Sequence, residues 1–306
     1  MARHPWDLAT PVALFIFNRP DTTRRVFEAI RAARPRHLLV VADGPRAWKE
    51  GEDERCRAAR SVIDAIDWDC QVITNFAVEN MGCKLRMSSG LDWVFQQIDE
   101  AIVLEDDCLP HPTFFRFCAE LLERYRNEHR IAQISGNNFQ FGRSTQPFSY
   151  YFSRYNHIWG WASWRRAWEL YDPTMSDWSA LRSSDLFSEL LSGAVERAYW
   201  IDALDRVYAG QLDTWDCQWT LSCWRHRLLT VIPAVNLVSN IGFGPGATNT
   251  PVANRYAAIA TQTMDFPLRH PADVHPNLTA DDYTGSTMFR PASLVSRLLA
   301  RLRGVA

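Results

Sequence analysis

The chain has 306 residues, of which 47% are hydrophobic, and its formal net charge is −2. This length permits one large α/β domain or two small ones, and the hydrophobic share excludes a disordered chain. Lys and Arg number 33 against 35 Asp and Glu, a balance that does not indicate a nucleic-acid-binding protein.

Seven cysteines are scattered along the chain, an odd number that includes no C-x-x-C pair. Neither a zinc ribbon nor a disulfide scaffold is indicated, and a reducing cytoplasm fits this usage best. The first apolar run, residues 11–17, is too short for a signal sequence or a membrane span. We therefore expect a soluble, cytoplasmic chain with at most peripheral contact with the inner membrane face.

The first half of the chain alternates strand and helix patterns. A continuous apolar run predicts a buried strand at 11–17, and further strands are predicted at 37–44, 70–76, 100–107 and 131–136. Amphipathic patterns predict helices at 21–34, 54–66 and 111–126, and another that carries Leu91, Val94, Phe95 and Ile98. Repeated units of this kind predict a Rossmann-like α/β fold with a mostly parallel sheet, in which ligands bind at the carboxyl ends of strands.

The second half is rich in Trp, Tyr and Asn. We expect helices at 161–171, 185–208 and 214–226 and a strand at 228–234. No linker-like stretch separates the halves, so residues 8–265 are interpreted as one catalytic domain and residues 266–306 as a C-terminal extension.

The most informative motif is a triplet of adjacent acids, Glu105-Asp106-Asp107, at the end of an apolar strand. Three neighbouring carboxylates repel one another unless a cation or hydrogen bonds neutralise them. Mg²⁺ and Mn²⁺ prefer carboxylate oxygens and share their remaining coordination positions with phosphates. The triplet therefore predicts a metal site, with a solvated acidic loop as the alternative.

Polar residues follow the other predicted strands at the same edge of the sheet. Arg19 follows the first strand and Asp43 the second, and the segment 80–84, which ends in Lys84, follows the third. An Asp can accept a hydrogen bond from a base N–H, and an Arg can face a base or a phosphate. Each residue alone is typical of a turn, but together they indicate one nucleotide-binding crevice.

Motifs of other nucleotide-binding folds are missing from the sequence. No G-x-G-x-x-G follows the first strand, which disfavours a dinucleotide-binding oxidoreductase, and the chain has no P-loop motif. A sugar-phosphate nucleotidylyltransferase would need a Gly-rich loop after the first strand, where this chain reads FNRPDT.

The segment 156–168 is dense in tryptophan. Trp161, Trp164 and Trp168 recur at helical spacing, which is most simply explained by a helix that packs into the core. Gly160, between two tryptophans, indicates a close approach of the backbone to another group. That group could be the sugar of a nucleotide-sugar donor, so Trp161 is a candidate substrate contact.

The segment 212–224 places Asp213 and Asp216 at the first turn of a predicted helix. An Asp in this position usually caps the helix. An inverting sugar transfer, however, needs one carboxylate to take a proton from the acceptor hydroxyl. Asp216 is the candidate for that catalytic base, and Asp213 is a candidate substrate contact.

In chain order, the segments PVALFIFNRP, VVADGPR, NMGCK, VLEDDCLPHPTFF, ISGNN, GWASW and WDCQW resemble those of the GT-A nucleotide-diphospho-sugar transferases. The resemblance is greatest to the branch of eukaryotic N-acetylglucosaminyltransferase I and its bacterial relatives, over about residues 10–245. It implies a GT-A-type fold and a transferase of the hexosyl or N-acetylhexosaminyl type.

The resemblance also implies roles for the acidic residues. Asp107 would bind the Mn²⁺ or Mg²⁺ that bridges the donor diphosphate, in the manner of a DxD-like motif. Glu105 and Asp106 would contact the nucleotide, and Asp216 would serve as the catalytic base.

On the nucleotide side, the resemblance implies that Arg19 and Asp43 hold the uridine. Two features depart from the family pattern. The eukaryotic enzymes have an N-terminal membrane anchor, which we do not expect for this chain, and this chain has Asn249 where the bacterial relatives often carry a His. His270 or His275 would then replace that His, unless its role is dispensable.

The sequence thus predicts a metal-dependent, inverting glycosyltransferase in polysaccharide or glycoconjugate biosynthesis. It would take a sugar from a nucleotide-diphosphate donor, with UDP as the expected nucleotide, to a glycan or glycolipid hydroxyl. Two alternatives stay open: a nucleotide-sugar-binding protein without turnover and a scaffold subunit of a glycan-assembly complex.

Residues 293–303 have leucines on one helical face, interspersed with arginines. They predict a short amphipathic helix that either contacts a membrane surface or packs on this domain or on a second subunit.

Overall fold

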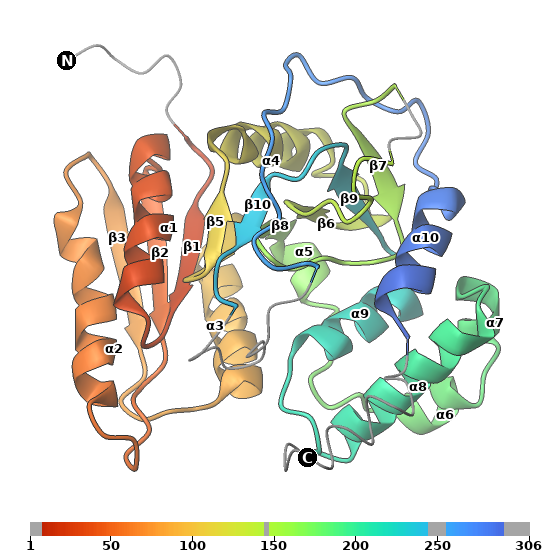
Figure 1. Ribbon diagram of the computed structural model, residues 1–306, viewed down its shortest axis with the longest axis horizontal. Coiled ribbons are helices and arrows are strands. Elements are labelled where there is room, and N and C mark those ends of the chain that lie inside the picture. Colours follow the sequence, from red (N-terminus) through yellow and green to blue (C-terminus); the bar gives the residue numbers. More distant parts are fainter. Residues whose placement is uncertain (1–7, 144–146, 244–254, 291–306) are drawn as a thin grey trace.

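The computed structural model describes residues 8–143, 147–243 and 255–290 (Figure 1). These residues form a Rossmann-like α/β domain, in which a mixed, mostly parallel sheet of eight strands is flanked by helices. The strand order is β3-β2-β1-β4-β8-β6-β9-β7, and a second, two-stranded sheet pairs β10 with β5. The fold class expected from the sequence is confirmed.

The structure sets the bounds of the elements as follows. The strands are β1 (Val12–Ile16), β2 (His37–Ala42), β3 (Gln71–Phe76), β4 (Glu100–Glu105), β5 (Cys108–Pro110), β6 (Ile131–Ser135), β7 (Tyr150–Ser153), β8 (Trp161–Trp164), β9 (Leu229–Pro233) and β10 (Val238–Asn240). The helices are α1 (Pro20–Ala33), α2 (Glu52–Arg60), α3 (Cys83–Gln97), α4 (Pro112–Arg124), α5 (Arg165–Trp168), α6 (Trp178–Arg182), α7 (Leu186–Leu190), α8 (Ala194–Tyr208), α9 (Asp216–Arg225) and α10 (Leu278–Met288), with a 3-10 turn at Ser61–Ala65.

The directions of the strands bring the ends of several strands to one edge of the sheet. β1 pairs in parallel with β2 and β4, and β2 pairs in parallel with β3. β8 is antiparallel to both β4 and β6, and β9 runs parallel to β6. The carboxyl ends of β1 to β4 consequently share one edge, which is where ligands bind in open α/β sheets.

Side chains of the central strands alternate between the two faces of the sheet. On one face, Leu14 and Ile16 of β1 pack in a core with Phe27 of α1 and Phe115 of α4. On the other face, Phe15 packs in a core that α3, α5 and α9 complete. Because both faces are covered, the strand is apolar throughout, as the continuous hydrophobic run predicts.

Helices α6, α7 and α8 gather at one end of the molecule, at the lower right of Figure 1. Together with α9 they enclose a separate core that includes Trp178, Phe187, Trp200 and Trp224. The indole N–H of Trp224 donates to the carbonyl oxygen of Arg154, just after β7, at 2.7 Å. This core thereby fixes α9 against the sheet.

Two helix predictions in the second half are wrong. Residues 161–171 are not one helix, because Trp161–Trp164 form β8 between β4 and β6 and only Arg165–Trp168 are helical. A short aromatic run suits a strand as well as a helix, and pairing with two neighbouring strands decides between them. The predicted helix 185–208 is divided into α7 and α8, with Gly193 at the N-cap of α8.

The observed strand β4 is shorter than the strand predicted at 100–107. β4 ends at Glu105, and Asp106 and Asp107 lie in the turn that leads into β5. The triplet is therefore divided between a strand end and a turn, which lets its side chains point in different directions.

Residues 255–290 pack along the sheet. Met264 and Leu268, on either side of the expected boundary at residue 265, are both buried in the core that contains Leu14. The predicted amphipathic helix 293–303 and Asn249 lie outside the described residues. Within the described ranges, no helix is long and apolar enough to cross a membrane.

Gly90 of α3 provides a test of the packing between this helix and the sheet. A Cβ at this position would lie 2.6 Å from an atom of Phe15 and 2.7 Å from an atom of Val41, both buried. Helix propensity alone would make Gly90→Ala stabilising by about 1 kcal/mol. We expect the overpacking, which typically costs ~1–3 kcal/mol, to outweigh that gain and lower the free energy of unfolding.

Chemical denaturation measures the effect. The matched control is Gln96→Ala on the exposed side of the same helix, which we expect to change stability by less than about 0.5 kcal/mol. A Gly90→Ala variant more stable than the parent would contradict the close approach of α3 to β1 and β2.

Candidate functional site

The acidic triplet lies at the carboxyl end of β4, beside the end of β1. Glu105 follows the alternation of β4, so its side chain is on the same face as Val103, which α3 and α9 cover. Asp106 lies on the other side, where its carboxylate accepts a hydrogen bond from the backbone N–H of Phe17 at 3.1 Å. Asp107 completes the turn into β5.

Arg19 forms ion pairs with two acids of the triplet. Its Nη2 is 2.6 Å from Oδ1 of Asp106, and its Nη1 is 3.0 Å from Oδ2 of Asp107. The resemblance implied that Arg19 holds the uridine, but here its guanidinium bridges the two carboxylates instead. A guanidinium suits such a bridge because its N–H donors form a rigid planar fork.

Burial and the crowding of carboxylates raise pKa values at this edge of the sheet. Burial raises the pKa of Glu105 well above its ordinary value, and the carboxylates of Asp107 and Asp106 add to the rise. Arg19 opposes this rise, whereas Asp216 contributes to it. Burial also raises the pKa of Asp106, although Arg19 acts against it. Carboxylate groups crowded in this way are a frequent property of functional sites.

Asp216 begins α9, which covers the face of the sheet on which Glu105 lies. Its charge contributes to the raised pKa of Glu105. It accepts a hydrogen bond from the hydroxyl of Thr214, and none of the described side chains caps α9. The capping alternative therefore does not hold for Asp216 in this structure.

Asp213, the candidate substrate contact, contacts the start of α3. Its carboxylate accepts hydrogen bonds from the backbone N–H groups of Cys83 at 3.2 Å and Lys84 at 3.3 Å, so it caps α3. Gly82 precedes them with a φ of 79°, and a Cβ there would be 3.1 Å from Asp213 Oδ2. The segment before α9 is thereby attached to the start of α3.

Asp43 holds a loop at the end of β2. Its carboxylate accepts hydrogen bonds from the backbone N–H groups of Gly44 at 2.8 Å and Met81 at 2.9 Å, and from the side chain of Asn80 at 2.8 Å. Burial raises its pKa, and the bonds from Met81 and Gly44 oppose that rise. Much of the hydrogen-bonding capacity expected for uridine is therefore engaged with the loop.

Glu52 lies between the loops after β1 and β2 and is not among the residues that the sequence patterns indicate. It is fully buried at the start of α2 and accepts hydrogen bonds from Asn18 at 2.7 Å and from the Arg46 backbone N–H and Nε at 2.8 Å each. It thus connects the loop after β1 with the loop after β2. No sequence signal distinguishes it, since Glu52 stands in the acidic run Glu52-Asp53-Glu54 that reads as a solvated helix start.

Trp161 lies on β8, opposite Val103 of β4. It is fully buried and stacks on Trp215, with 5.8 Å between ring centroids and 24° between ring planes. Its indole N–H is buried and has no hydrogen-bond partner within the described part of the chain. The expected direct contact with substrate therefore conflicts with its burial, and the ring supports Trp215, which precedes Asp216.

The sheet of β5 and β10 brings a second loop to the triplet. Ile241, just after β10, donates its backbone N–H to the carbonyl oxygen of Asp107 at 2.8 Å. A Cβ on the next residue, Gly242, would lie 2.0 Å from Asp107 Oδ2 and 2.6 Å from Arg19 Nη1. Only a glycine can lie against the ion pair in this way.

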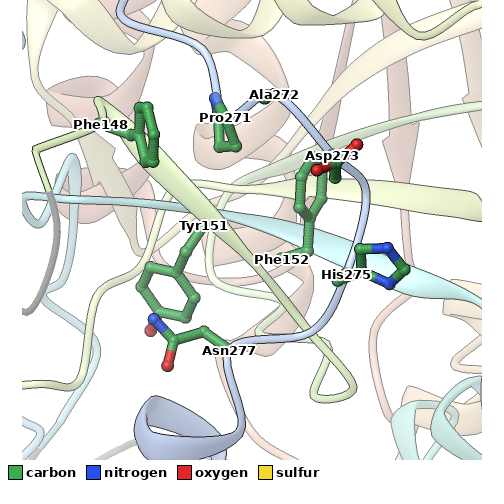
Figure 2. A pocket seen from close by; sticks show the side chains of 8 residues that line it. All are labelled: Phe148, Tyr151, Phe152, Pro271, Ala272, Asp273, His275 and Asn277. Carbon is green, nitrogen blue, oxygen red and sulfur yellow. The ribbon is translucent and has the colours of Figure 1, made fainter.

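Neither of the two histidines considered as substitutes for a metal or phosphate contact lies near the triplet. His270 contacts Tyr150 at 2.9 Å, and His275 lines a pocket of about 370 Å³ beside β7 (Figure 2). Strands β8, β6 and β9 separate β7 from β4.

The described residues contain no group of three His, Cys, Asp or Glu side chains that could hold a metal ion alone. Mg²⁺ is often bound by one or two carboxylates, with phosphate and water completing its coordination. The triplet offers only oxygen donors and excess negative charge, and the side chain of Asp107 is 12% exposed against 4% for Asp106. These residues therefore fit a divalent cation that is shared with a phosphate ligand.

Comparisons with known proteins leave the family open. No protein-family model and no curated protein sequence match the chain. A UDP-glucose pyrophosphorylase in complex with UDP-glucose is similar with a TM-score of 0.31 and 9% identity, over 73% of this chain and 90% of that one. A 4-diphosphocytidyl-2C-methyl-D-erythritol synthase from Anaerococcus prevotii gives 0.27 and 10%, over 65% and 85%. Likenesses this distant carry no argument about function.

Glu52 makes the site sensitive to acid. Burial tends to raise its pKa, but hydrogen bonds from Arg46 and Asn18 outweigh burial and lower the pKa to about 2. Its contribution to stability is therefore present above its unfolded pKa of about 4.3 and is lost as the pH falls toward 2. We expect Glu52→Gln to lower the free energy of unfolding at pH 7 by about 2–4 kcal/mol, because it breaks a buried ion pair.

The measurement is chemical denaturation of Glu52→Gln and of Glu54→Gln, an exposed position on the same helix. The difference between Glu52→Gln and the parent should narrow from pH 7 to pH 3, whereas Glu54→Gln should match the parent at pH 7. A difference that grows on acidification would contradict the lowered pKa.

Proposed function

We propose that this chain is a glycosyltransferase that moves a sugar from a nucleotide-diphosphate donor to an acceptor hydroxyl, with inversion and with a divalent cation. The observation that carries the proposal is the placement of the acidic triplet at the carboxyl edge of the sheet and of Asp216 at the start of α9, which covers the same face as Glu105. The charge of Asp216 also contributes to the raised pKa of Glu105. A sugar transfer needs a group that stabilises the leaving diphosphate and, opposite it, a base for the acceptor.

On the donor side, Asp107 would hold Mn²⁺ or Mg²⁺, which stabilises the negative charge of the departing diphosphate. Asp106 and Glu105 would orient the nucleotide and its ribose. Lys84, on the partly exposed first turn of α3, is the candidate to meet a phosphate, and Asp43 would shape the nucleotide pocket through the loop it holds. UDP remains the expected nucleotide through the sequence resemblance.

On the acceptor side, Asp216 would take the proton of the acceptor hydroxyl as its oxygen attacks the anomeric carbon. The bond between that carbon and the diphosphate breaks on the opposite face, so the anomeric configuration inverts. The hydrogen bond from Thr214 and the stack of Trp215 on Trp161 would hold the carboxylate in position for this step. A glycan or glycolipid is the expected acceptor class.

Asp216→Asn tests the catalytic base. Removing a positioned base should lower kcat by about 10²–10⁴-fold. Binding of the nucleotide should be unchanged, because the triplet is intact. The assay is the release of free nucleotide from a sugar donor with Mn²⁺, and Asp202→Asn on the exposed side of α8 is the matched control. If the parent protein binds a donor but releases no nucleotide with any acceptor tested, the chain is a binding protein and the proposal fails.

Asp107→Ala tests the cation site. A ligand that binds only the native state raises the apparent melting temperature, so a panel of UDP-, GDP- and dTDP-sugars with Mn²⁺ identifies the donor by thermal shift. We expect Asp107→Ala to lose the Mn²⁺-dependent part of that shift and all metal-dependent turnover, with its fold intact. Full activity of the variant with excess donor would show that Asp107 is not the ligand.

A further inference from the structure

Arg19 is placed as the outer partner of an otherwise buried ion-pair cluster. The side chains of Asp106 and Asp107 are 4% and 12% exposed, whereas that of Arg19 is 26% exposed. The two acids are fixed from within by the backbone, because Phe17 donates its N–H to the Asp106 carboxylate and Ile241 donates its N–H to the Asp107 carbonyl oxygen. The guanidinium is therefore the part of the cluster that is least constrained by its surroundings.

The contact on Asp107 occupies one oxygen of the carboxylate that the proposed function assigns to a cation, and the other oxygen accepts a hydrogen bond from the thiol of Cys108 at 3.5 Å. Arg19 Nη1 lies 3.0 Å from Oδ2 of Asp107, and a Cβ on Gly242 would meet both of these atoms. Gly242 thus lies directly against the contact, which leaves little room for a second cation beside the guanidinium. In this arrangement, a divalent ion at Asp107 would compete with the guanidinium for the same carboxylate.

We propose that Arg19 is an exchangeable counter-ion: it occupies Asp107 while no donor is bound, and it transfers to the donor diphosphate when a divalent cation takes that carboxylate. This inference rests on the proposed function and adds to it an order of binding.

Arg19 can move from a carboxylate to a phosphate because Arg binds both groups with the same planar, two-pronged hydrogen-bond geometry. On release, Asp106 retains the hydrogen bond from the Phe17 N–H, so its buried carboxylate keeps a partner. Asp107 exchanges one positive partner for another. The exchange couples the two ligands: a divalent cation alone must displace the guanidinium, whereas a cation with a diphosphate offers the guanidinium a new anionic partner.

The experiment measures Mn²⁺ binding by isothermal titration calorimetry, with and without UDP as the diphosphate probe. The variants are Arg19→Gln, which removes the competing charge, and Arg19→Lys, which retains a charge but cannot bridge two carboxylates. Arg24→Gln is the control, since Arg24 is on the same helix, is 60% exposed and pairs only with the exposed Asp21 among the ion pairs of the described residues.

For the parent protein and Arg24→Gln, we expect weak Mn²⁺ binding alone and at least tenfold tighter binding with UDP. Arg19→Gln should bind Mn²⁺ alone at least tenfold more tightly than the parent and gain much less from UDP, with Arg19→Lys between them. Thermal melting in EDTA checks that each variant is folded, and Arg19→Lys tests the proposal if Arg19→Gln is not.

If neither Arg19 variant binds Mn²⁺ alone more tightly than the parent, although UDP still strengthens binding in the parent, Arg19 is not a competitor and the exchange is wrong. That result would leave the proposed function standing. If Mn²⁺ binds to neither the parent nor the variants, with or without UDP or the other nucleotides of the panel, the metal-dependent function itself is wrong.

Discussion

The cost of crowding carboxylates at the end of β4 governs the arrangement of the site. A buried carboxylate is unfavourable unless hydrogen bonds or an opposite charge compensate it, and here three follow one another in sequence. Ending the strand at Glu105 sends the acids to different sides, and Arg19 compensates two of them. Glu105 has no such counter-ion among the ion pairs of the described residues, and the divalent cation of the proposed function would bind beside it.

Hydrogen bonds connect the loops around the triplet with one another. Asp43 ties the end of β2 to the loop before α3, Glu52 ties the loops after β1 and β2, and Asp213 ties the segment before α9 to α3. Each of these acids is engaged with backbone N–H groups or with other side chains. They therefore act mainly as structural supports for the loops, and in the proposed function a nucleotide would be held more by backbone groups and by Lys84 than the sequence resemblance implies.

Much of the fold follows from local sequence patterns, because strands buried on both faces must be apolar throughout. The patterns fail where a residue's environment is set by distant segments. Trp161 is in a strand because β4 and β6 flank it, and strands as short as β5 and β10 are too short to show a period. The burial of Glu52 depends on Asn18 and Arg46, which lie on separate loops. Its acidic neighbours in sequence therefore do not indicate that it is buried.

Distant segments also determine the different roles of Asp213 and Asp216, so the sequence alone does not distinguish these roles. Both precede or begin one helix, and each alone reads as a helix cap. In three dimensions Asp213 does cap a helix, but that helix is α3, whose start is distant in sequence. By fixing the segment before α9 to α3, Asp213 sets where α9 begins, and so it sets the position of Asp216 relative to the triplet. As the proposed base, Asp216 would need such support, because a misplacement of about 1 Å at a reacting group can lower a rate by 10²-fold.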